Sequence, residues 1–298
     1  MSLRRFPVSR HLAGAQGLSA FTFGLQAPMS DNVRIAHSAD SLPTLLHKLD
    51  PLARFEHVPT IGSTNTELMR RARAGDTSTC LLWADQQSAG RGRMGRQWQG
   101  QAGDALTFSL GTLLSPADWS GLSLAVGCCL ADSLDPSHAL GIGLKWPNDL
   151  VVKPSPNNMR KLGGILIETV VRQEPGHSSR FAVIGIGLNL SLPVAADYRN
   201  EPAGLREWLG QGLQPHEVLH TLLQDLMEGL QRFERAGFAA FHTAFMRRDA
   251  LAGQMLTLSN GKQGRAAGVD SQGVLQIDSN QGRIQVSSDE VSVSGTAS

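Results

Sequence analysis

The chain has 298 residues, and its 27 basic and 26 acidic side chains give a formal net charge of +1. This balance excludes a generally basic surface for nucleic acid, and the 41% hydrophobic content excludes a disordered chain. No apolar run approaches the roughly 18 residues that a membrane-spanning helix needs, so no membrane association is expected.

The first 50 residues differ in composition from the rest of the chain. No Asp or Glu precedes Asp31, whereas Arg4 and Arg5 lie close to the start. This pattern predicts a poorly ordered or leader-like extension over residues 1–50, with Met29 as an alternative start. The segment lacks the two amphipathic helices of a winged helix-turn-helix, so it is not expected to bind DNA.

A catalytic domain is expected over residues 51–250. Thr64 and Glu67 have the spacing of a capping box, which predicts a helix from there to Gly75. Further apolar segments predict strands over 55–61, 80–84, 106–114, 142–145, 151–152, 161–168 and 181–190, with a loop over 153–160. Apolar periodicity predicts helices over 121–134, 215–235 and 238–249.

The three cysteines show no spacing that indicates a metal or a disulfide framework. Cys128 and Cys129 fall inside the apolar helix 121–134 and are interpreted as core residues, and Cys80 begins a buried strand. This usage fits a reducing, cytoplasmic compartment.

The last segment, residues 251–298, changes to short strands at close spacing. The turn pairs Asn260-Gly261 and Gln281-Gly282 separate them. Strands are expected over 255–258, 264–269, 274–277 and 283–286. Together they predict a small SH3-like β-barrel.

A basic, glycine-rich stretch, the Arg/Gly loop (residues 90–98), lies between two of the apolar strands. It contains three glycines and three arginines and ends in Trp98. Glycine lets the backbone approach a ligand closely, and arginine matches the geometry of carboxylate and phosphate oxygens. The composition predicts a loop that closes over a polyanion beside a flat aromatic surface.

Five motifs together resemble those of the biotin protein ligases. They are Ser63 to Asn65, Gln87 to Trp98, Lys145 to Asp149, Lys161 to Ile165 and Gly185 to Asn189. The resemblance covers roughly residues 55 to 298. It implies an α+β fold related to class II aminoacyl-tRNA synthetases, with a mixed sheet, helices and an SH3-like carboxy-terminal domain.

The resemblance also implies a reaction in two steps. Biotin and ATP, with Mg²⁺, form biotinyl-5′-AMP and pyrophosphate, and the biotinyl group is then transferred to a lysine of a biotin carboxyl carrier protein. The carrier is expected to be part of a carboxylase. Nucleic acid is not an expected partner, and the resemblance leaves a homodimer open.

By the same resemblance, small polar groups recognise the ureido ring of biotin. These are Ser63, Thr64 and Asn65, with Gln87 nearby. The loop residues Arg91, Gly92 and Arg93 close over biotin and the adenylate. Lys161 is expected to be the catalytic cation that reaches both the biotin carboxylate and the α-phosphate, and Arg93 to hold their junction.

The resemblance also implies which residues bind the nucleotide. Arg96 is expected to meet the departing pyrophosphate, Trp98 to lie against adenine, and Asn189 to contact the adenine end. Asn148 and Asp149 are expected in the region that binds the nucleotide and magnesium. No residue is predicted to be a metal ligand. Met94 replaces an arginine that is common in the family and so removes one cation from the loop.

Each motif also has a purely structural interpretation when it is taken singly. In that interpretation, Ser63 and Thr64 do no more than cap a helix, and Lys161 is an exposed lysine at the start of a strand. The glycines at 163 and 164 could mark a bulge. The joint order of the five motifs favours the functional interpretation.

Other functions have weaker support. His216 to His220 spells H-E-x-x-H, which is typical of a zinc peptidase, but no third ligand follows at a usual spacing and the motif lies in the first turn of its helix. A lipoate or octanoate transferase shares the fold but lacks the Arg/Gly loop. A P-loop kinase is disfavoured because Gly261-Lys262 is followed by Gln263.

Overall fold

The computed structural model describes residues 40–155, 158–174, 177–193, 201–287 and 291–293. Its centre is a seven-stranded sheet with the order β1-β2-β3-β7-β6-β5-β4. Only β1 and β2 run parallel, and the other neighbours are antiparallel. The strands are β1 Arg54–Ile61, β2 Cys80–Gln87, β3 Ala105–Leu114, β4 Ile142–Lys145, β5 Asp149–Ser155, β6 Asn158–Glu174 and β7 His177–Asn189.

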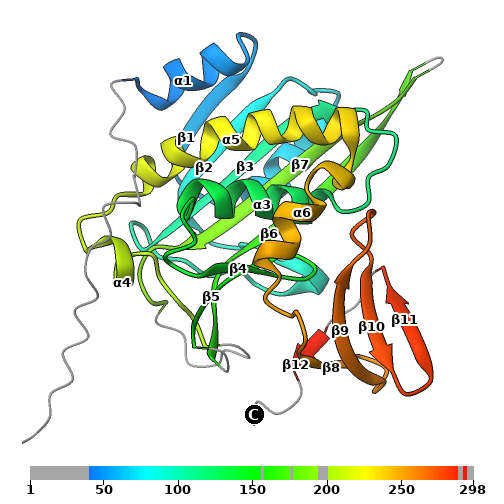
Figure 1. Ribbon diagram of the computed structural model, residues 1–298. Helices are drawn as coiled ribbons and strands as arrows, with labels where there is room; N and C mark the ends of the chain where they lie inside the picture. Colours follow the sequence, from blue (N-terminus) through cyan, green and yellow to red (C-terminus); the bar gives the residue numbers. More distant parts are fainter. Residues whose placement is uncertain (1–39, 156–157, 175–176, 194–200, 288–290, 294–298) are drawn as a thin grey trace, which may run out of the picture.

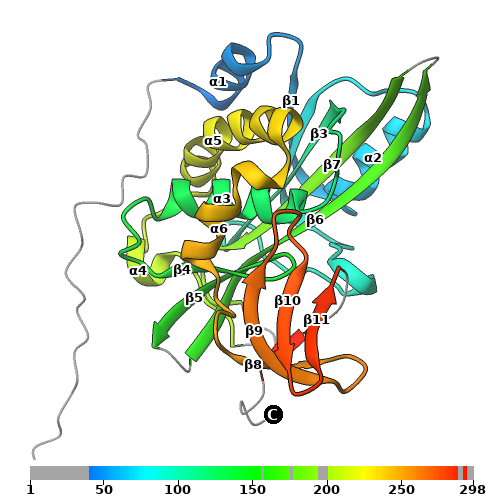
Figure 2. The same cartoon turned by 45° about the vertical axis from the view of Figure 1, so that its right-hand side comes forward.

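Helices cover both faces of this sheet, and Figures 1 and 2 show α3 and α5 on one face and α2 on the other. The helices are α1 Leu42–Leu49, α2 Thr64–Arg73, α3 Leu122–Leu134, α4 Arg206–Leu209, α5 Pro215–Ala236 and α6 His242–Arg248, with 3-10 turns η1 Arg93–Gly95 and η2 Phe238–Ala240. The main hydrophobic core lies under α3 and α5. A smaller cluster lies under α2 and includes Leu68, Leu82 and Val183.

Helix α3 runs through the interior of the protein. Ten of its residues are buried, including Cys128 and Cys129, as the apolar sequence predicted. It packs against α5 so closely that a methyl group at Gly229 would lie 2.2 Å from the Cys129 Sγ. Helix α5 is amphipathic and buries one face, in agreement with its leucine spacing.

The carboxy-terminal domain is a five-stranded antiparallel sheet with the order β11-β10-β9-β8-β12. Its strands are β8 Met255–Leu258, β9 Gln263–Val269, β10 Leu275–Ser279, β11 Gly282–Val286 and β12 Val291–Val293. The Trp146 Nε1 donates to the Gly273 carbonyl at 3.0 Å, so a residue beside the central sheet contacts the turn before β10 directly. The sequence predicted four of these strands and missed β12.

Several sequence predictions need correction. The segment 1–50, predicted to be a poorly ordered or leader-like extension, contains helix α1, whose Leu42 and Leu46 are buried in the main core, so the folded chain begins before residue 51. The signal was present, since Ser41 caps α1 and leucines recur at helical spacing. Residues 1–39, including Met29, lie outside the described residues.

Three local predictions were also imprecise. The true cap of α2 is Ser63, whose hydroxyl accepts from the Thr66 N–H, and the Glu67 carboxylate instead pairs with Arg70 and Arg71. Of the loop predicted over 153–160, residues 153–155 belong to β5 and residues 158–160 to β6. The helix expected over 238–249 is divided into η2 and α6. Among the described residues, no helix is long and apolar enough to cross a membrane.

A buried arginine ties the end of α6 to the central sheet. The Arg248 side chain is 1% exposed and donates to the Ile142 carbonyl at 3.0 Å and to the Asp135 carbonyl. Its Nε also donates to Asp132 at 2.8 Å. The fully buried Asp135 carboxylate accepts the backbone N–H groups of Leu140 and Ile142. The network therefore holds β4, which leads directly into Lys145 to Asp149.

Candidate functional site

A pocket of about 1260 Å³ lies on the α2 face of the sheet. Its floor contains Gly187 on β7, which is paired with Gly164 on β6. Gly185 lies two residues before Gly187 on β7 and so faces the same side of the sheet. Strand register places Thr107 on one side of this row and Asp149 on the other. The three glycine positions carry no side chain of their own, so neighbouring side chains can pack directly against the sheet there.

Small polar side chains form one end of the pocket. The Gln87 Oε1 accepts the Thr64 backbone N–H at 2.7 Å, and the Thr64 Oγ1 lies 2.7 Å from the Ser109 Oγ. The Ser109 hydroxyl donates to the Asn65 Oδ1 at 2.7 Å. Because Thr64, Asn65 and Ser109 are all buried, this hydrogen-bonded network is fixed in place.

Counting protons in this network limits the direction of each bond. Ser109 has one hydroxyl proton and gives it to Asn65, so the Thr64 hydroxyl donates either to the Ser109 Oγ at 2.7 Å or to the Gln87 Oε1 at 3.1 Å. The Asn65 Nδ2 donates to the Leu166 carbonyl at 3.3 Å and to the Glu168 Oε2 at 3.1 Å. Both amide protons of Asn65 are then used within the protein. Asn65 therefore shapes the pocket wall, whereas the Gln87 Nε2 donates to no acceptor within the described residues.

The Arg/Gly loop is a short hairpin over the pocket. Arg91 and Gln97 pair as an antiparallel bridge, and the Gly92 N–H donates to the Arg96 carbonyl at 2.8 Å. Met94, at the tip, has φ 54° and ψ 36° and is 74% exposed. An exposed side chain in the left-handed region contributes little to the fold, so the absent arginine at this position is a change in loop charge and not in core packing.

Trp98, at the end of the loop, packs over the glycine floor. A methyl group added to Gly187 would lie 2.4 Å from the Cε2 and 2.6 Å from the Cζ2 of the Trp98 ring. The indole can occupy this position only because residue 187 has no side chain. The Trp98 Nε1 is buried and has no hydrogen-bond partner within the described part of the chain.

Lys161 and Asp149 form an ion pair inside the pocket. The Lys161 Nζ lies 2.7 Å from the Asp149 Oδ1, and Lys161 remains 31% exposed. The backbone around this lysine is held by the segment 201–205, because its N–H donates to Glu201 and its carbonyl accepts from Ala203. The backbone of Lys161 is thus fixed, while its ammonium group remains partly solvated.

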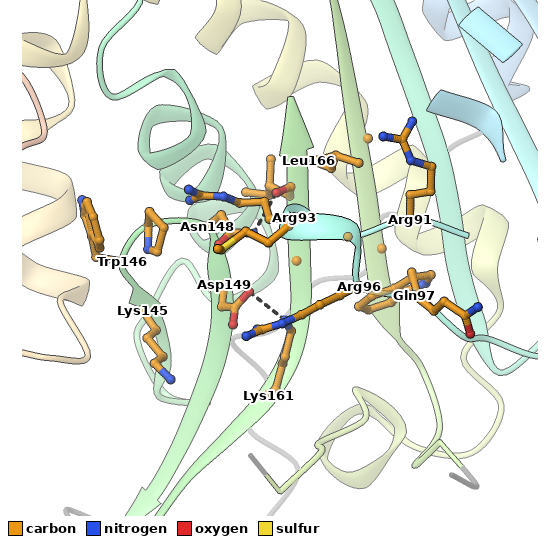
Figure 3. A pocket seen from close by; sticks show the side chains of 18 of the residues that line it. Arg91, Arg93, Arg96, Gln97, Lys145, Trp146, Asn148, Asp149, Lys161 and Leu166 are labelled. Carbon is orange, nitrogen blue, oxygen red and sulfur yellow. Dashed lines mark hydrogen bonds and ion pairs between the residues drawn. The ribbon is translucent and has the colours of Figure 1, made fainter. Parts of the chain in front are cut away.

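Three cationic side chains reach this part of the pocket. In Figure 3, Arg96 points toward Asp149 and Lys161, and Arg93 extends across the pocket to the side of Asn148. The Asn148 Nδ2 donates to the Ile165 carbonyl at 3.0 Å. In the same view Arg91 points away from Lys161. A strongly anionic ligand would therefore be met by Arg93, Arg96 and Lys161.

All but one of the sequence-predicted site residues line this pocket. The lining residues are Ser63, Thr64, Asn65, Gln87, Arg91, Gly92, Arg93, Arg96, Trp98, Asn148, Asp149 and Lys161. Asn189 is not among them, since its buried amide donates to the carbonyls of Lys161 and Ala203 at 3.3 and 3.1 Å. Its contact is with the backbone of the lysine.

Two polar residues of the site were missed by sequence reasoning. Ser109 lies inside the mostly apolar strand β3, and its polarity was the available signal. Glu168 lies inside β6, at the end of the strand predicted over 161–168, where an acidic residue after an apolar run was the signal. Both become part of the site only through strand register.

Alternative centres find less support. Glu217 of the H-E-x-x-H motif accepts the Gln214 N–H at 2.8 Å and so caps α5. The described residues contain no group of three or more metal-binding side chains. Burial raises the pKa of the Cys80 and Cys129 thiols to about 12, so these thiols stay protonated and are poor nucleophiles.

Comparison with known proteins gives a consistent result. Residues 58–189 match the model of the biotin/lipoate A/B protein ligase family. The bifunctional ligase/repressor BirA of Escherichia coli is 32% identical over 230 residues, which cover 74% of this chain and 68% of that protein. The biotin–[acetyl-CoA-carboxylase] ligase of Paracoccus denitrificans is 30% identical over 246 residues, which cover 78% and 98%.

Solved structures agree on the fold. A biotin protein ligase from Aquifex aeolicus in complex with biotin and ATP superposes with a TM-score of 0.64 and 25% identity, covering 80% of this chain and 97% of that one. The predicted α+β architecture with a small β domain is therefore confirmed.

Proposed function

The chain belongs to the biotin/lipoate A/B protein ligase family, and on that premise we propose that it activates biotin with ATP and transfers it to a carrier protein. The product of activation is biotinyl-5′-AMP. The acceptor is a specific lysine of a biotin carboxyl carrier protein. Relatives named as biotin–[acetyl-CoA-carboxylase] ligases support a carboxylase as the owner of that carrier.

The distribution of groups in the pocket carries this proposal. Neutral donors and acceptors around Gln87 and Thr64 suit a cyclic urea, whereas Arg93, Arg96 and Lys161 suit a carboxylate beside a triphosphate. Ser109 on β3 and Asp149 on β5 are three strand spacings apart, which is about 14 Å. A ring with a flexible acid tail can span this floor, and Trp98 offers a surface for adenine.

The residues present suit each chemical step. A carboxylate oxygen of biotin bonds to the α-phosphorus of ATP, the bond to the β-phosphate oxygen breaks, and pyrophosphate leaves. Two anions must approach each other, so Lys161 and Arg93 stabilise the charge where it accumulates. In the second step the amine of the carrier lysine attacks the acyl carbon, AMP leaves, and the amine loses a proton.

Magnesium fits this pocket as a companion of the nucleotide. Asp149 and Glu201 are the carboxylates among the described lining residues, and Asp149 already contacts Lys161. Mg²⁺ commonly uses one or two carboxylates together with substrate phosphates, so Asp149 is the residue that would hold it. When bound, the ion neutralises phosphate charge.

Partners and compartment complete the proposal. We expect a carrier domain as the macromolecular partner and a reducing cytoplasm as the setting, which the three free, buried cysteines support. BirA is named as both a ligase and a repressor, and we propose only the ligase activity for this chain. A homodimer through a sheet edge remains an expectation from the resemblance.

Pyrophosphate exchange tests the activation step. Purified protein with Mg²⁺ and ATP should exchange labelled pyrophosphate into ATP when biotin is added, and not when lipoate or octanoate replaces it. Mass spectrometry of a carrier domain should then show one biotinyl group. Exchange with lipoate or octanoate alone would instead assign the chain to the other branch of the family.

A matched pair of glycine variants tests the adenine side. Gly187→Ala should raise the KM for ATP about tenfold, because the new methyl group must displace the Trp98 ring from the floor. Gly212→Ala is the control, since nothing lies within 4 Å of a methyl group there. An unchanged KM for ATP in Gly187→Ala would argue against adenine binding beside Trp98.

A further inference from the structure

Glu168 connects the polar end of the pocket to the Arg/Gly loop. Its side chain projects from β6 on the same face as Gly164 and Leu166, just beyond the pocket floor. Its Oε1 lies 3.3 Å from the Arg91 Nη2, and its Oε2 lies 3.4 Å from the Arg91 Nη1. The same Oε2 accepts the Asn65 Nδ2 at 3.1 Å. One carboxylate therefore contacts both the loop and the buried network.

Arg91 lies at the base of the Arg/Gly loop. It pairs with Gln97 at the base of the hairpin, whereas Arg93, Met94 and Gly95 form the tip. The Arg91 guanidinium also lies 3.5 Å from the Thr66 hydroxyl on α2. Holding the base fixes the direction in which the tip projects. Figure 3 agrees, because Arg91 points away from Lys161 while Arg93 and Arg96 point into the pocket.

We infer that Glu168 is a positioning residue that anchors the Arg/Gly loop over the pocket through Arg91 and so prolongs retention of the activated acid. This role rests on the proposed function. Arg91 then serves as the anchor point of the loop, and Arg93 and Arg96 are the loop cations that meet the ligand.

The strength of the contact suits a loop that must open and close. Arg91 is 48% exposed and Glu168 is 21% exposed, and ion pairs with this much solvent contact are weak. A weak anchor holds the loop in place most of the time but still permits entry of ATP and exit of product. Its removal should therefore change loop opening by about fivefold and not unfold the domain.

Limited trypsin digestion measures this opening without any substrate, because the loop carries cleavage sites after Arg91, Arg93 and Arg96. Glu168→Gln should increase the rate of cleavage in the loop about fivefold. Arg91→Gln, which leaves the Asn65 contact intact, should do the same at the two remaining sites. Glu56→Gln is the matched control, because it breaks a half-buried ion pair with Arg71 that does not touch the loop.

The outcomes separate the anchor from a general loss of stability. Faster loop cleavage in Glu168→Gln and Arg91→Gln, with Glu56→Gln like the wild type, supports the inference. Equal cleavage in Glu168→Gln and the wild type, or an equal increase in Glu56→Gln, would overturn it.

A second readout concerns the activated acid. With biotin and ATP, Glu168→Gln should release biotinyl-5′-AMP about fivefold faster than the wild type. An unchanged release rate would overturn the role in retention. If the wild-type protein shows no exchange with biotin, the proposed function fails, whereas the digestion result still decides whether Glu168 anchors the loop.

Discussion

Replacing Lys161 with alanine should lower biotin-dependent pyrophosphate exchange by about 100- to 1000-fold, the usual effect of removing one group that stabilises developing charge. The ammonium lies inside the pocket, 2.7 Å from Asp149, and is the cation that we propose stabilises the attack of the biotin carboxylate on the α-phosphate. The backbone of Lys161 is held in place by bonds to Glu201 and Ala203. The measurement is the exchange rate at saturating biotin and ATP.

Stability should change little in this variant, since the Lys161 side chain is 31% exposed and outside the hydrophobic core. Lys262→Ala, in an exposed turn of the carboxy-terminal domain, is the control and should exchange at the wild-type rate. An exchange rate in Lys161→Ala within threefold of the wild type would remove Lys161 from the catalytic role.

The Arg248→Met variant should lose about 3–5 kcal/mol of unfolding free energy, the usual cost of breaking a buried ion pair from one side. The substitution leaves the buried Asp135 carboxylate without its cation and the carbonyls of Asp135 and Ile142 without their donor. For a domain of this size the thermal midpoint should fall by roughly 10 °C. Denaturant unfolding followed by circular dichroism measures the change.

The neighbouring arginine provides the control. Arg247 is exposed, so Arg247→Met should change the unfolding free energy by less than about 0.5 kcal/mol. Similar losses in both variants would show that the charge of α6 matters and that the buried network does not.

Much of the site could be predicted from the sequence because its chemistry is local in the chain. Each of its motifs is short, and their basic residues indicate an anionic ligand. These motifs include the Arg/Gly loop, the segment Lys145 to Asp149 and the segment that begins at Lys161. The apolar strands and the amphipathic helix α5 followed from periodicity, which depends only on neighbouring positions. Helix α1 was missed because a basic, small-residue segment precedes it and outweighed its own cap and leucine spacing.

What depends on distant parts of the chain could not be predicted in this way. Asn65 contacts Glu168 across 103 positions, and Ser109 joins the network only because β3, β7 and β6 align in one register. A shift of one residue would turn Ser109 and Gly187 to the opposite face of the sheet. No local pattern specifies that register.

The sequence by itself determined which residue types line the pocket, the order of the elements and the family to which they belong. Only the tertiary structure decided what each polar group does. It turned Asn189 toward the backbone of Lys161, used both amide protons of Asn65 inside the protein, and paired Arg91 with Glu168. The physical reason is that a hydrogen-bonding group has few donors and acceptors, and the fold determines which partners come within reach.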